Sequence, residues 1–218
     1  MFKISITPEE IESLPLTVFP GEIQVIDKAD DAFVKAINYL KRQKLIGFDT
    51  ESRPCFTPGQ HNYGVSLLQL SSSKRAFLFR IKKTGMKKSL CDILANPKII
   101  KVGAAVNDDI NGLAKYHNFE PKSFVDLQKI VWEYGIKDKS VKKMSAIILG
   151  IKVSKAQQLS NWEAETLSEA QMNYAATDAW VCREMYLKLQ KSEKNPLTFE
   201  QRFPNLPKQQ VDNDKDNS

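Results

Sequence analysis

The stretch LIGFDTES, residues 45–52, is an apolar run followed by two acidic side chains. Its first four residues have the composition of a buried β-strand, and Asp49 and Glu51 continue that strand. Side chains at positions i and i+2 of a strand point to the same face, so both carboxylates enter one small volume. Two bare carboxylates there repel each other unless a cation lies between them, and oxygen ligands of this kind suit Mg²⁺ or Mn²⁺. Because a pair with this spacing is common by chance, it predicts a metal site only together with other parts of the chain.

Apolar periodicity on both sides of this stretch predicts a succession of strands and helices. Strands are expected at residues 22–26, 45–50, 65–70, 76–79, 98–103 and 123–126. Helices are expected at residues 30–44, 86–95, 107–117, 127–134, 141–149 and 168–191, after a short helical segment within residues 1–22. Strands concentrated in the first half, with interleaved and trailing helices, favour an α/β fold with a mixed sheet covered on both faces.

The expected helix at residues 168–191 contains a second carboxylate position. Ser168 is its expected N-cap, and Tyr174 and Asp178 are four residues apart, so they share one helix face. A phenol one turn from a carboxylate ligand is placed to orient a water molecule bound at a metal. In the alternative interpretation, Tyr174 packs on the core while Asp178 faces solvent.

A third acidic position is Asp109, within the segment VGAAVNDDINGL at residues 102–113. Taken with the other two, it makes the chain resemble the DEDD superfamily of 3′–5′ exonucleases in its tyrosine-bearing branch, and above all ribonuclease D and the Werner-type exonuclease domain. The resemblance covers about residues 23–190. It also includes VSLLQLSSSKRAFLFRI at residues 65–81 and LSNWEAETLSEAQMNYAATDAW at residues 159–180.

The resemblance assigns the acidic residues to family motifs. Asp49 and Glu51 fall on the first motif, Asp109 on the second, and Tyr174 with Asp178 on the third. The adjacent Asp108 is an alternative to Asp109, and the spacing to residues 102–103 and 113 selects Asp109. Neighbouring helical positions point about 100° apart, so the two side chains cannot serve equally. Whether Asp108 contributes as well is left open.

The resemblance also implies a ribonuclease H-like fold with five main strands and a hydrolytic activity. Nucleic acid would be hydrolysed from its 3′ end to nucleoside 5′-monophosphates, with two divalent cations, Mg²⁺ or Mn²⁺. Asp49 would be shared between the cations, Glu51 and Asp178 would bind one of them, and Asp109 would hold the other. Tyr174 would orient the attacking water. The alternatives are a nucleic-acid-binding module without hydrolysis, which would lack acidic ligands, and an unrelated α/β enzyme that matches by chance.

Candidates for substrate binding with a weaker sequence signal lie next to these motifs. Arg53 could meet a phosphate and Phe56 could stack on a base, or both could be ordinary loop residues. Asn161 is a candidate substrate contact, with a loop hydrogen-bonding role as the alternative. Trp162 is expected to pack in the core, and Asp126 is expected to cap a helix.

The composition supports a nucleic-acid partner and excludes several other kinds of site. The formal net charge of +6 and the pI near 9.1 favour a polyanion. Two histidines far apart, and three cysteines without CxxC spacing, argue against a zinc site, a His-based triad or a disulfide framework. Lysines gather at positions 82, 83, 87 and 88 and at positions 137, 139, 142 and 143. These clusters either bind phosphates or are solvated helix ends and loops.

We expect three segments along the 218 residues: an N-terminal segment (1–22), the exonuclease domain (23–192) and a polar, mobile tail (193–218). The first residues lack the apolar core of a signal peptide, and no run approaches the roughly 20 apolar residues of a membrane span. The expected location is therefore cytoplasmic. DNA or RNA preference, strandedness, processivity and oligomeric state do not follow from the sequence.

Overall fold

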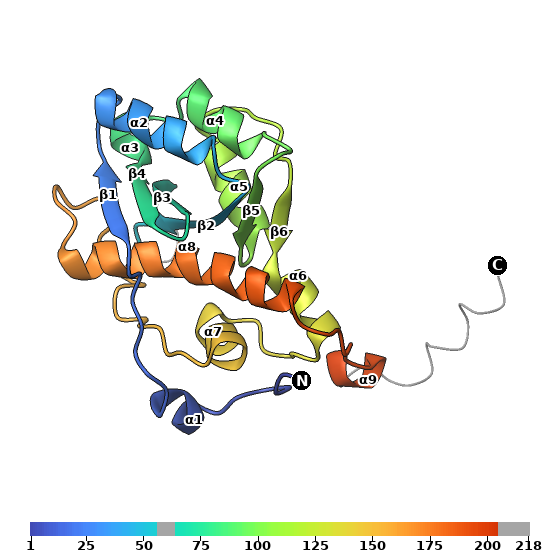
Figure 1. Cartoon of the computed structure of the whole chain (residues 1–218). Coiled ribbons are helices and arrows are strands. Elements are labelled where there is room, and N and C mark those ends of the chain that lie inside the picture. The colour runs from blue at the N-terminus through green and yellow to red at the C-terminus, as the bar shows by residue number, and fades with distance from the viewer. Residues whose placement is uncertain (56–63, 205–218) are drawn as a thin grey trace, which may run out of the picture.

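Six strands form one sheet in the order β1-β4-β3-β2-β5-β6 (Figure 1). The structure is a computed structural model, and it describes residues 1–55 and 64–204. The strands are β1 (Glu22–Ile26), β2 (Leu45–Ser52), β3 (Val65–Ser71), β4 (Arg75–Arg80), β5 (Ile100–Gly103) and β6 (Phe124–Asp126). The sheet is mixed, because β3 is antiparallel to both β2 and β4 while β1, β5 and β6 join as parallel strands. The expected α/β fold with a mixed sheet is confirmed.

The number of strands differs from the five that the family resemblance implies. All six strands expected from the apolar pattern are present, so the resemblance undercounts the sheet by one. The outermost strand β1 pairs with β4 from Glu22↔Arg75 to Ile26↔Phe79 and covers the edge that β4 would otherwise leave open. Covering an edge strand in this way satisfies backbone groups that would otherwise be unpaired.

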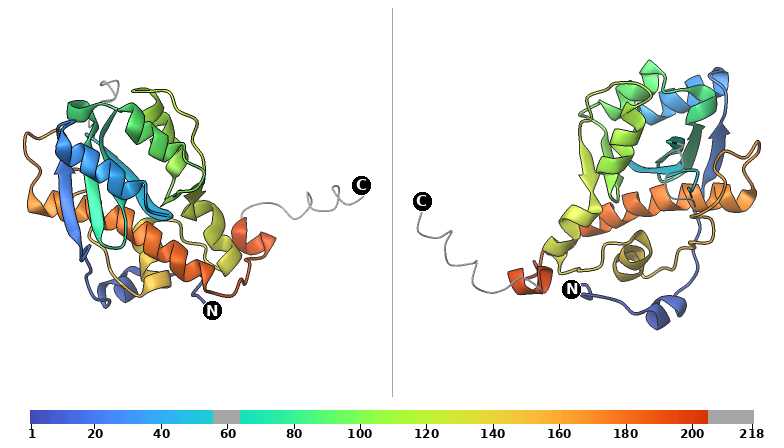
Figure 2. Two further views of the ribbon diagram at one scale, coloured as in Figure 1. Left: turned by 45° about the horizontal axis from the view of Figure 1, so that its top comes forward. Right: turned by 180° about the vertical axis from the view of Figure 1, so that it is seen from behind.

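Helices cover both faces of the sheet. They are α1 (Pro8–Glu12), α2 (Asp31–Leu40), α3 (Ile81–Thr84), α4 (Lys88–Leu94), α5 (Val106–Ala114), α6 (Leu127–Ile130), the 3₁₀ helix η1 (Val131–Tyr134), α7 (Val141–Leu149), α8 (Glu169–Gln190) and α9 (Phe199–Arg202). Figures 1 and 2 show α2, α4 and α5 on one face and α8 across the other, with α7 and then α1 beyond α8. Among the described residues, no helix is both long enough and apolar enough to cross a membrane.

Successive side chains of β2 point alternately to the helix layer of α2, α4 and α5 and to the layer of α8. Ile46 and Phe48 belong to the apolar cluster under α2, α4 and α5. The intervening positions therefore face α8. Asp49 and Glu51 continue that second set, which places both carboxylates on the face covered by α8.

Gly47 allows α8 to lie directly on the centre of the sheet. α8 packs against all strands from β1 to β5. A Cβ atom at Gly47 would lie 1.8 Å from the backbone oxygen of Ala179, the residue that follows Asp178. The close approach of β2 and α8 therefore requires glycine at position 47, and it sets how near Asp178 comes to Asp49.

We expect Gly47→Ala to destabilise the protein by about 2 kcal/mol or more, because backbone atoms must move to remove the clash. Urea unfolding would measure the loss. Gly150→Ala is the matched control, since its added Cβ meets nothing within 4 Å and only its left-handed φ of +70° resists a side chain. Its expected cost is about 1 kcal/mol. Equal costs for both variants would contradict the close approach as the reason for Gly47.

The ends of the chain pack around the α8 layer. In the N-terminal segment, the N–H of Phe19 donates to the Thr177 hydroxyl of α8, at 2.9 Å. At the other end, the N–H groups of Asn195 and Leu197 donate to backbone oxygens of η1. The first part of the expected tail thus has defined contacts, while residues 205–218 lie outside the described residues. The division into three segments stays a prediction.

Candidate active site

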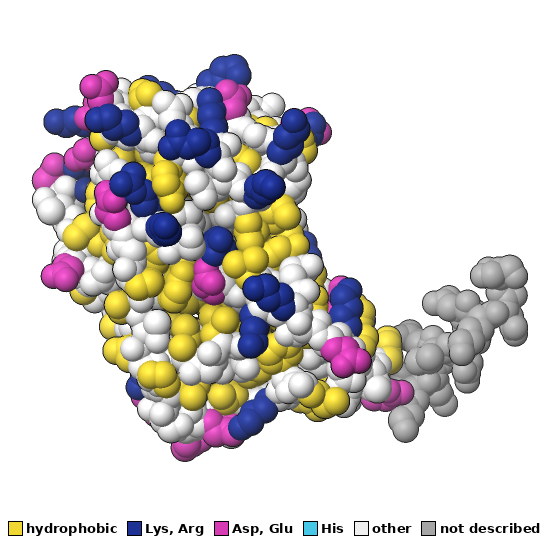
Figure 3. Space-filling view, viewed as in Figure 1, with side chains coloured by type: hydrophobic (Ala, Val, Ile, Leu, Met, Phe, Trp, Pro, Cys, Tyr) yellow, Lys and Arg dark blue, Asp and Glu magenta, His cyan; other side chains and the backbone are white. Residues whose placement is uncertain are grey.

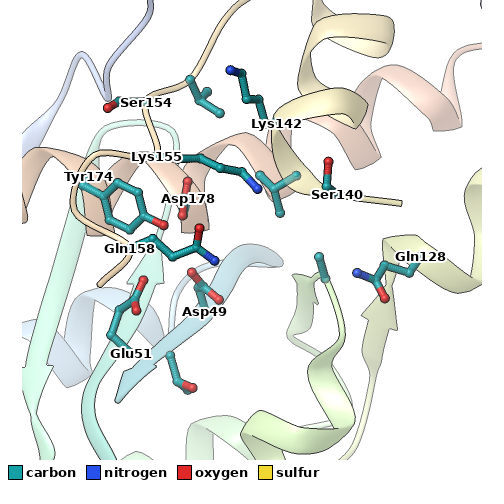
Figure 4. Close-up of a pocket in the computed structure, with 14 residues that line it drawn as sticks. Asp49, Glu51, Gln128, Ser140, Lys142, Ser154, Lys155, Gln158, Tyr174 and Asp178 are labelled. Carbon is teal, nitrogen blue, oxygen red and sulfur yellow. The ribbon is translucent and has the colours of Figure 1, made fainter. Parts of the chain in front are cut away.

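Three carboxylates meet where β2 passes under α8. One oxygen each from Asp49, Glu51 and Asp178 lies within 4.8 Å of the others. Figure 4 shows the three side chains pointing toward one another from β2 and α8. Asp178 is brought there by α8, which begins at Ser168 with a capping box to Gln171, as expected from the sequence. The structure therefore joins the first and third acidic motifs.

These carboxylates line a cavity of about 300 Å³ that is open to solvent. Besides them, its lining comprises Thr50, Ala104, Gln128, Ser140, Val141, Lys142, Val153, Ser154, Lys155, Gln158 and Tyr174. Among the described residues, no lysine or arginine forms an ion pair with any of the three carboxylates. Oxygen donors held together without an ion-pair partner fit a hard divalent cation.

Tyr174 is held between the core and the carboxylates. Its side chain is only 9% exposed, and its ring packs against Trp162 with centroids 5.9 Å apart. Its hydroxyl donates a hydrogen bond to Asp178. Both interpretations of this segment thus apply in part: the ring packs on the core, while the hydroxyl and Asp178 face the cavity.

Burial raises the pKa of every member of the cluster, and repulsion from neighbouring carboxylates adds to the rise at Asp49 and Glu51. The pKa of Asp49 lies well above its ordinary value, chiefly because of burial and then because of Glu51 and Asp178. Burial raises the pKa of Glu51 to about 9, with Asp178 and Asp109 adding to the effect. The pKa of Asp178 rises to about 7 through burial, against the lowering effects of the Tyr174 hydrogen bond and of Lys155. Protons therefore occupy sites that a cation would take.

Asp109 lies beside this cluster without joining it. It accepts a hydrogen bond of 2.5 Å from the hydroxyl of Thr50. Thr50 lies between Asp49 and Glu51 on β2, so its side chain points to the opposite face of the sheet, where α5 lies. Burial raises the pKa of Asp109 to about 6, and the Thr50 hydrogen bond opposes this rise. Asp108 is exposed, so the structure places Asp109 rather than Asp108 toward β2.

Asp126 fixes the position from which α5 starts. Its carboxylate accepts from the N–H of Gln128, so it is the N-cap of α6, as predicted. The same oxygen accepts from the N–H of Ala105, at 3.0 Å. Ala105 has the left-handed φ of 59°, which costs a residue other than glycine on the order of 1 kcal/mol. Asp126 therefore compensates a strained residue at the start of the helix that carries Asp109.

Arg53 and Asn161, two of the three candidates for substrate binding, do not line the cavity. Arg53 is exposed and has its guanidinium 3.7 Å from the carboxylate of Glu163. Asn161 is exposed and accepts a hydrogen bond from the N–H of Glu163, which is the loop role considered as its alternative. Trp162 is completely buried, as predicted. Phe56 lies outside the described residues.

Several cavity residues carry no sequence signal of their own. Lys155 and Gln158 come from the loop between α7 and α8, and Figure 4 shows both side chains extending toward the carboxylates. Gln128 and Ser140 approach from the α6 and α7 side. Only Lys142 belongs to a feature visible in the sequence, the lysine cluster at residues 137–143. The loop residues follow no periodic pattern, and their position becomes evident only once α7 and α8 are packed.

Comparison with known proteins identifies the family of the chain. Residues 24–193 match the family model described as 3'-5' exonuclease, a class of hydrolases that act on nucleic acids. The chain belongs to this 3′–5′ exonuclease family. The family inferred from the resemblance is thereby confirmed.

Individual relatives agree with this assignment. Exonuclease 3'-5' domain-containing protein 2 of Drosophila melanogaster is 34% identical over 176 residues, which are 77% of this chain and 30% of that protein. The mouse bifunctional 3'-5' exonuclease/ATP-dependent helicase WRN is 29% identical over 188 residues, 82% of this chain and 13% of that protein. The chain thus spans less than a third of the length of either relative.

Two solved structures confirm the fold. The Nibbler EXO domain of Aedes aegypti aligns with a TM-score of 0.68 and 24% identity, over 80% of this chain and 91% of that one. Escherichia coli RNase D aligns with a TM-score of 0.69 and 24% identity, over 78% of this chain and 44% of that one.

Proposed function

We propose that the protein removes nucleotides from the 3′ end of a nucleic acid as nucleoside 5′-monophosphates, in the manner of the tyrosine-bearing branch of its family. The observation that carries the proposal is the group of three carboxylates within 4.8 Å of one another, with the Tyr174 hydroxyl on Asp178. A binding module without hydrolysis would not need all four carboxylates and the tyrosine, and all five residues are present.

Two divalent cations, Mg²⁺ or Mn²⁺, fit the donor set. Asp49 would contact both, Glu51 and Asp178 would hold one, and Asp109 would hold the other from the α5 side. Bound there, the cations would supply Lewis-acid stabilisation of the phosphate and a lower pKa for the attacking water. Because the carboxylates must lose protons to bind them, cation affinity should rise with pH.

The remaining cavity residues position the substrate. Tyr174 donates to Asp178, and burial followed by the charge of Asp178 raises the pKa of its phenol above the ordinary value. The hydroxyl therefore stays protonated and orients the attacking water rather than removing its proton. Lys155 and Gln158 extend over the carboxylates, where an ammonium and an amide can hold the oxygens of the scissile phosphate (Figure 4).

A digestion panel tests the proposal. Single- and double-stranded DNA and RNA, each labelled at the 3′ or the 5′ end, would be incubated with Mg²⁺, Mn²⁺ or EDTA. We expect products shortened from the 3′ end, release of 5′-monophosphates, and no activity in EDTA. A 3′-phosphate should block digestion and a closed circle should survive. Full turnover in the chelator, or degradation of circles, would overturn the proposal.

A pair of neighbouring substitutions tests the assignment within α5. We expect Asp109→Asn to lower kcat by roughly 100-fold, because it removes a charged ligand that Thr50 orients. Asp108→Asn should keep most of the activity, since that side chain is exposed. Steady-state kinetics on a single-stranded oligonucleotide would measure both. The reverse result would show that Asp108, not Asp109, faces the cations.

We also propose a cytoplasmic location, which rests on the sequence alone. Imaging of the tagged full-length protein would test this proposal, and exclusive secretion or membrane association would contradict it.

A further inference from the structure

A second groove adjoins the catalytic cavity on the side of α6 and α9. It is formed by α6, η1, the segment that follows them and the C-terminal helix α9. Its lining comprises Gln128, Lys129, Trp132, Ile136, Lys137, Lys139, Leu197, Arg202 and Phe203. Leu197, Arg202 and Phe203 lie beyond residues 24–193, the part of the chain that matches the family model. One wall of the groove is therefore built by residues outside the family match.

The groove continues directly from the catalytic cavity. Gln128 lines both, and its side-chain amide donates to the backbone oxygen of Lys139, at 3.1 Å. The chain then passes from Lys137 and Lys139 in the groove to Ser140 and Lys142 in the cavity. A strand whose 3′ end lies at the carboxylates can therefore leave the cavity past Gln128 into the groove.

The charge of the groove is uniformly positive. It contains three lysines and one arginine, and no carboxylate lines it. In the described part of the chain, none of these four cations forms an ion pair. Nearby acidic residues are already paired, Glu133 with Lys194 and Asp138 with Lys143. Lysine and arginine side chains are spread over much of the face seen in Figure 3, with acidic ones among them, so the net charge alone does not single out this groove.

Aromatic side chains accompany these charges. The Arg202 guanidinium lies 3.7 Å from the centre of the Trp132 ring. Phe203 is 40% exposed and Phe199 is 46% exposed, with ring centroids 5.0 Å apart. Exposed rings beside cations are the combination that binds single strands, because bases stack on the rings while the cations contact phosphates.

We propose that this groove binds the part of a single-stranded nucleic acid that lies 5′ to the nucleotides in the catalytic cavity. Lys137, Lys139 and Arg202 contact its phosphates, and Phe203 stacks on a base. The inference rests on the proposed exonuclease function and adds to it a substrate class, single strands long enough to reach from the carboxylates to α9.

Binding of a fluorescent 12-nucleotide single strand in EDTA, where no hydrolysis occurs, tests the groove. The variant K137A/K139A/R202A should bind with a Kd at least about tenfold higher, and the slope of log Kd against log salt should fall by about 0.7 for each phosphate that the protein no longer neutralises. The matched control is K35A/K41A/R42A, which removes two exposed lysines and one exposed arginine at α2, on the opposite face. Its Kd should change less than twofold. Equal weakening in both variants would overturn the proposal.

Two further measurements separate a binding groove from a structural role. Phe203→Ala should weaken binding without changing the salt slope, because stacking releases no counterions. With Mg²⁺ or Mn²⁺, the triple variant should show a raised KM and an unchanged kcat on the 12-mer. Its rates should approach those of the wild type as the strand is shortened to two nucleotides. A loss of kcat at every length would instead mean that the substitutions damage the catalytic cavity, and the groove proposal would fail.

The two proposals fail in different ways. If the wild type cleaves no substrate but binds the 12-mer through the three groove residues, the exonuclease proposal is wrong and the groove stands. If the wild type cleaves from the 3′ end while K137A/K139A/R202A binds and cleaves like the wild type, the groove proposal is wrong and the exonuclease proposal stands.

Discussion

Asp49→Asn is expected to lower kcat by on the order of 10³-fold or more, because it removes the carboxylate that would contact both cations. The substitution keeps the size of the side chain and replaces a charged oxygen by an amide. Asp49, Glu51 and Asp178 offer one oxygen each to the site, so the substitution leaves only two carboxylates of the three. Single-turnover hydrolysis of a labelled single strand would measure the loss without interference from product release.

The same substitution is expected to stabilise the metal-free protein at neutral and alkaline pH. A buried carboxyl whose pKa is raised in the folded state destabilises that state once it ionises. For Glu51 this loss of stability develops as pH rises from about 4.5, its ordinary pKa, to about 9. For Asp178 it develops from about 3.8 to about 7. The pKa of Asp49 also lies well above its ordinary value, because of burial and then of Glu51, Asp178 and Asp109, so its ionisation destabilises the folded state and the asparagine removes that cost.

Urea unfolding in EDTA across the range from pH 4.5 to pH 9 would measure this effect. The free energy of unfolding of the wild type should fall as pH rises, and that of Asp49→Asn should fall less. Adding Mg²⁺ or Mn²⁺ should restore stability to the wild type, and most strongly at high pH. Asp27→Asn, at an exposed position after β1, is the control. An Asp49→Asn protein that kept wild-type turnover would contradict the assignment of Asp49 as the shared ligand.

The elements with strong periodicity could be predicted from the sequence almost residue by residue. β1 and α7 have the expected bounds, and β2 extends the expected strand by two residues. In these segments the pattern of apolar side chains reports directly on which face is buried. The carboxylates of β2 and α8 could be found for the same reason, since a period of two or of 3.6 residues places them on known faces.

Other parts of the site depend on contacts that no local pattern reveals. Lys155 and Gln158 lie in an irregular loop, and their place over the carboxylates is set by the packing of α7 against α8. Asp109 reaches β2 from the opposite face, where Thr50 binds it. The four-residue helix α9 is short and polar, and its position depends on the packing of residues 195–203 against η1. The groove it completes is therefore a property of the tertiary structure.

Tyr174→Phe is expected to lower kcat by roughly 10²–10⁴-fold, the range for a positioned group that assists proton transfer or orients a water. The substitution removes one hydroxyl and keeps the ring that packs on Trp162. In the wild type, the hydrogen bond from Tyr174 lowers the pKa of Asp178, and the variant lacks this bond. The carboxylate itself remains, so the affinity for divalent cations should stay nearly unchanged. The effect should therefore appear in kcat rather than in the concentration of Mn²⁺ that gives half-maximal activity.

Tyr186→Phe is the matched control, because it removes a phenol hydroxyl from the same helix, about two turns beyond Asp178 and outside the cavity lining. Its activity should equal that of the wild type. The pH profile of kcat distinguishes orientation from base catalysis. Burial followed by the Asp178 charge raises the pKa of the Tyr174 phenol above its ordinary value of 10. If the hydroxyl only orients water, kcat should depend on pH in the same way in the wild type and in Tyr174→Phe, and only the height of the profile should differ. A variant with wild-type kcat would show that the hydroxyl has no catalytic part, and water activation would then rest on the cations alone.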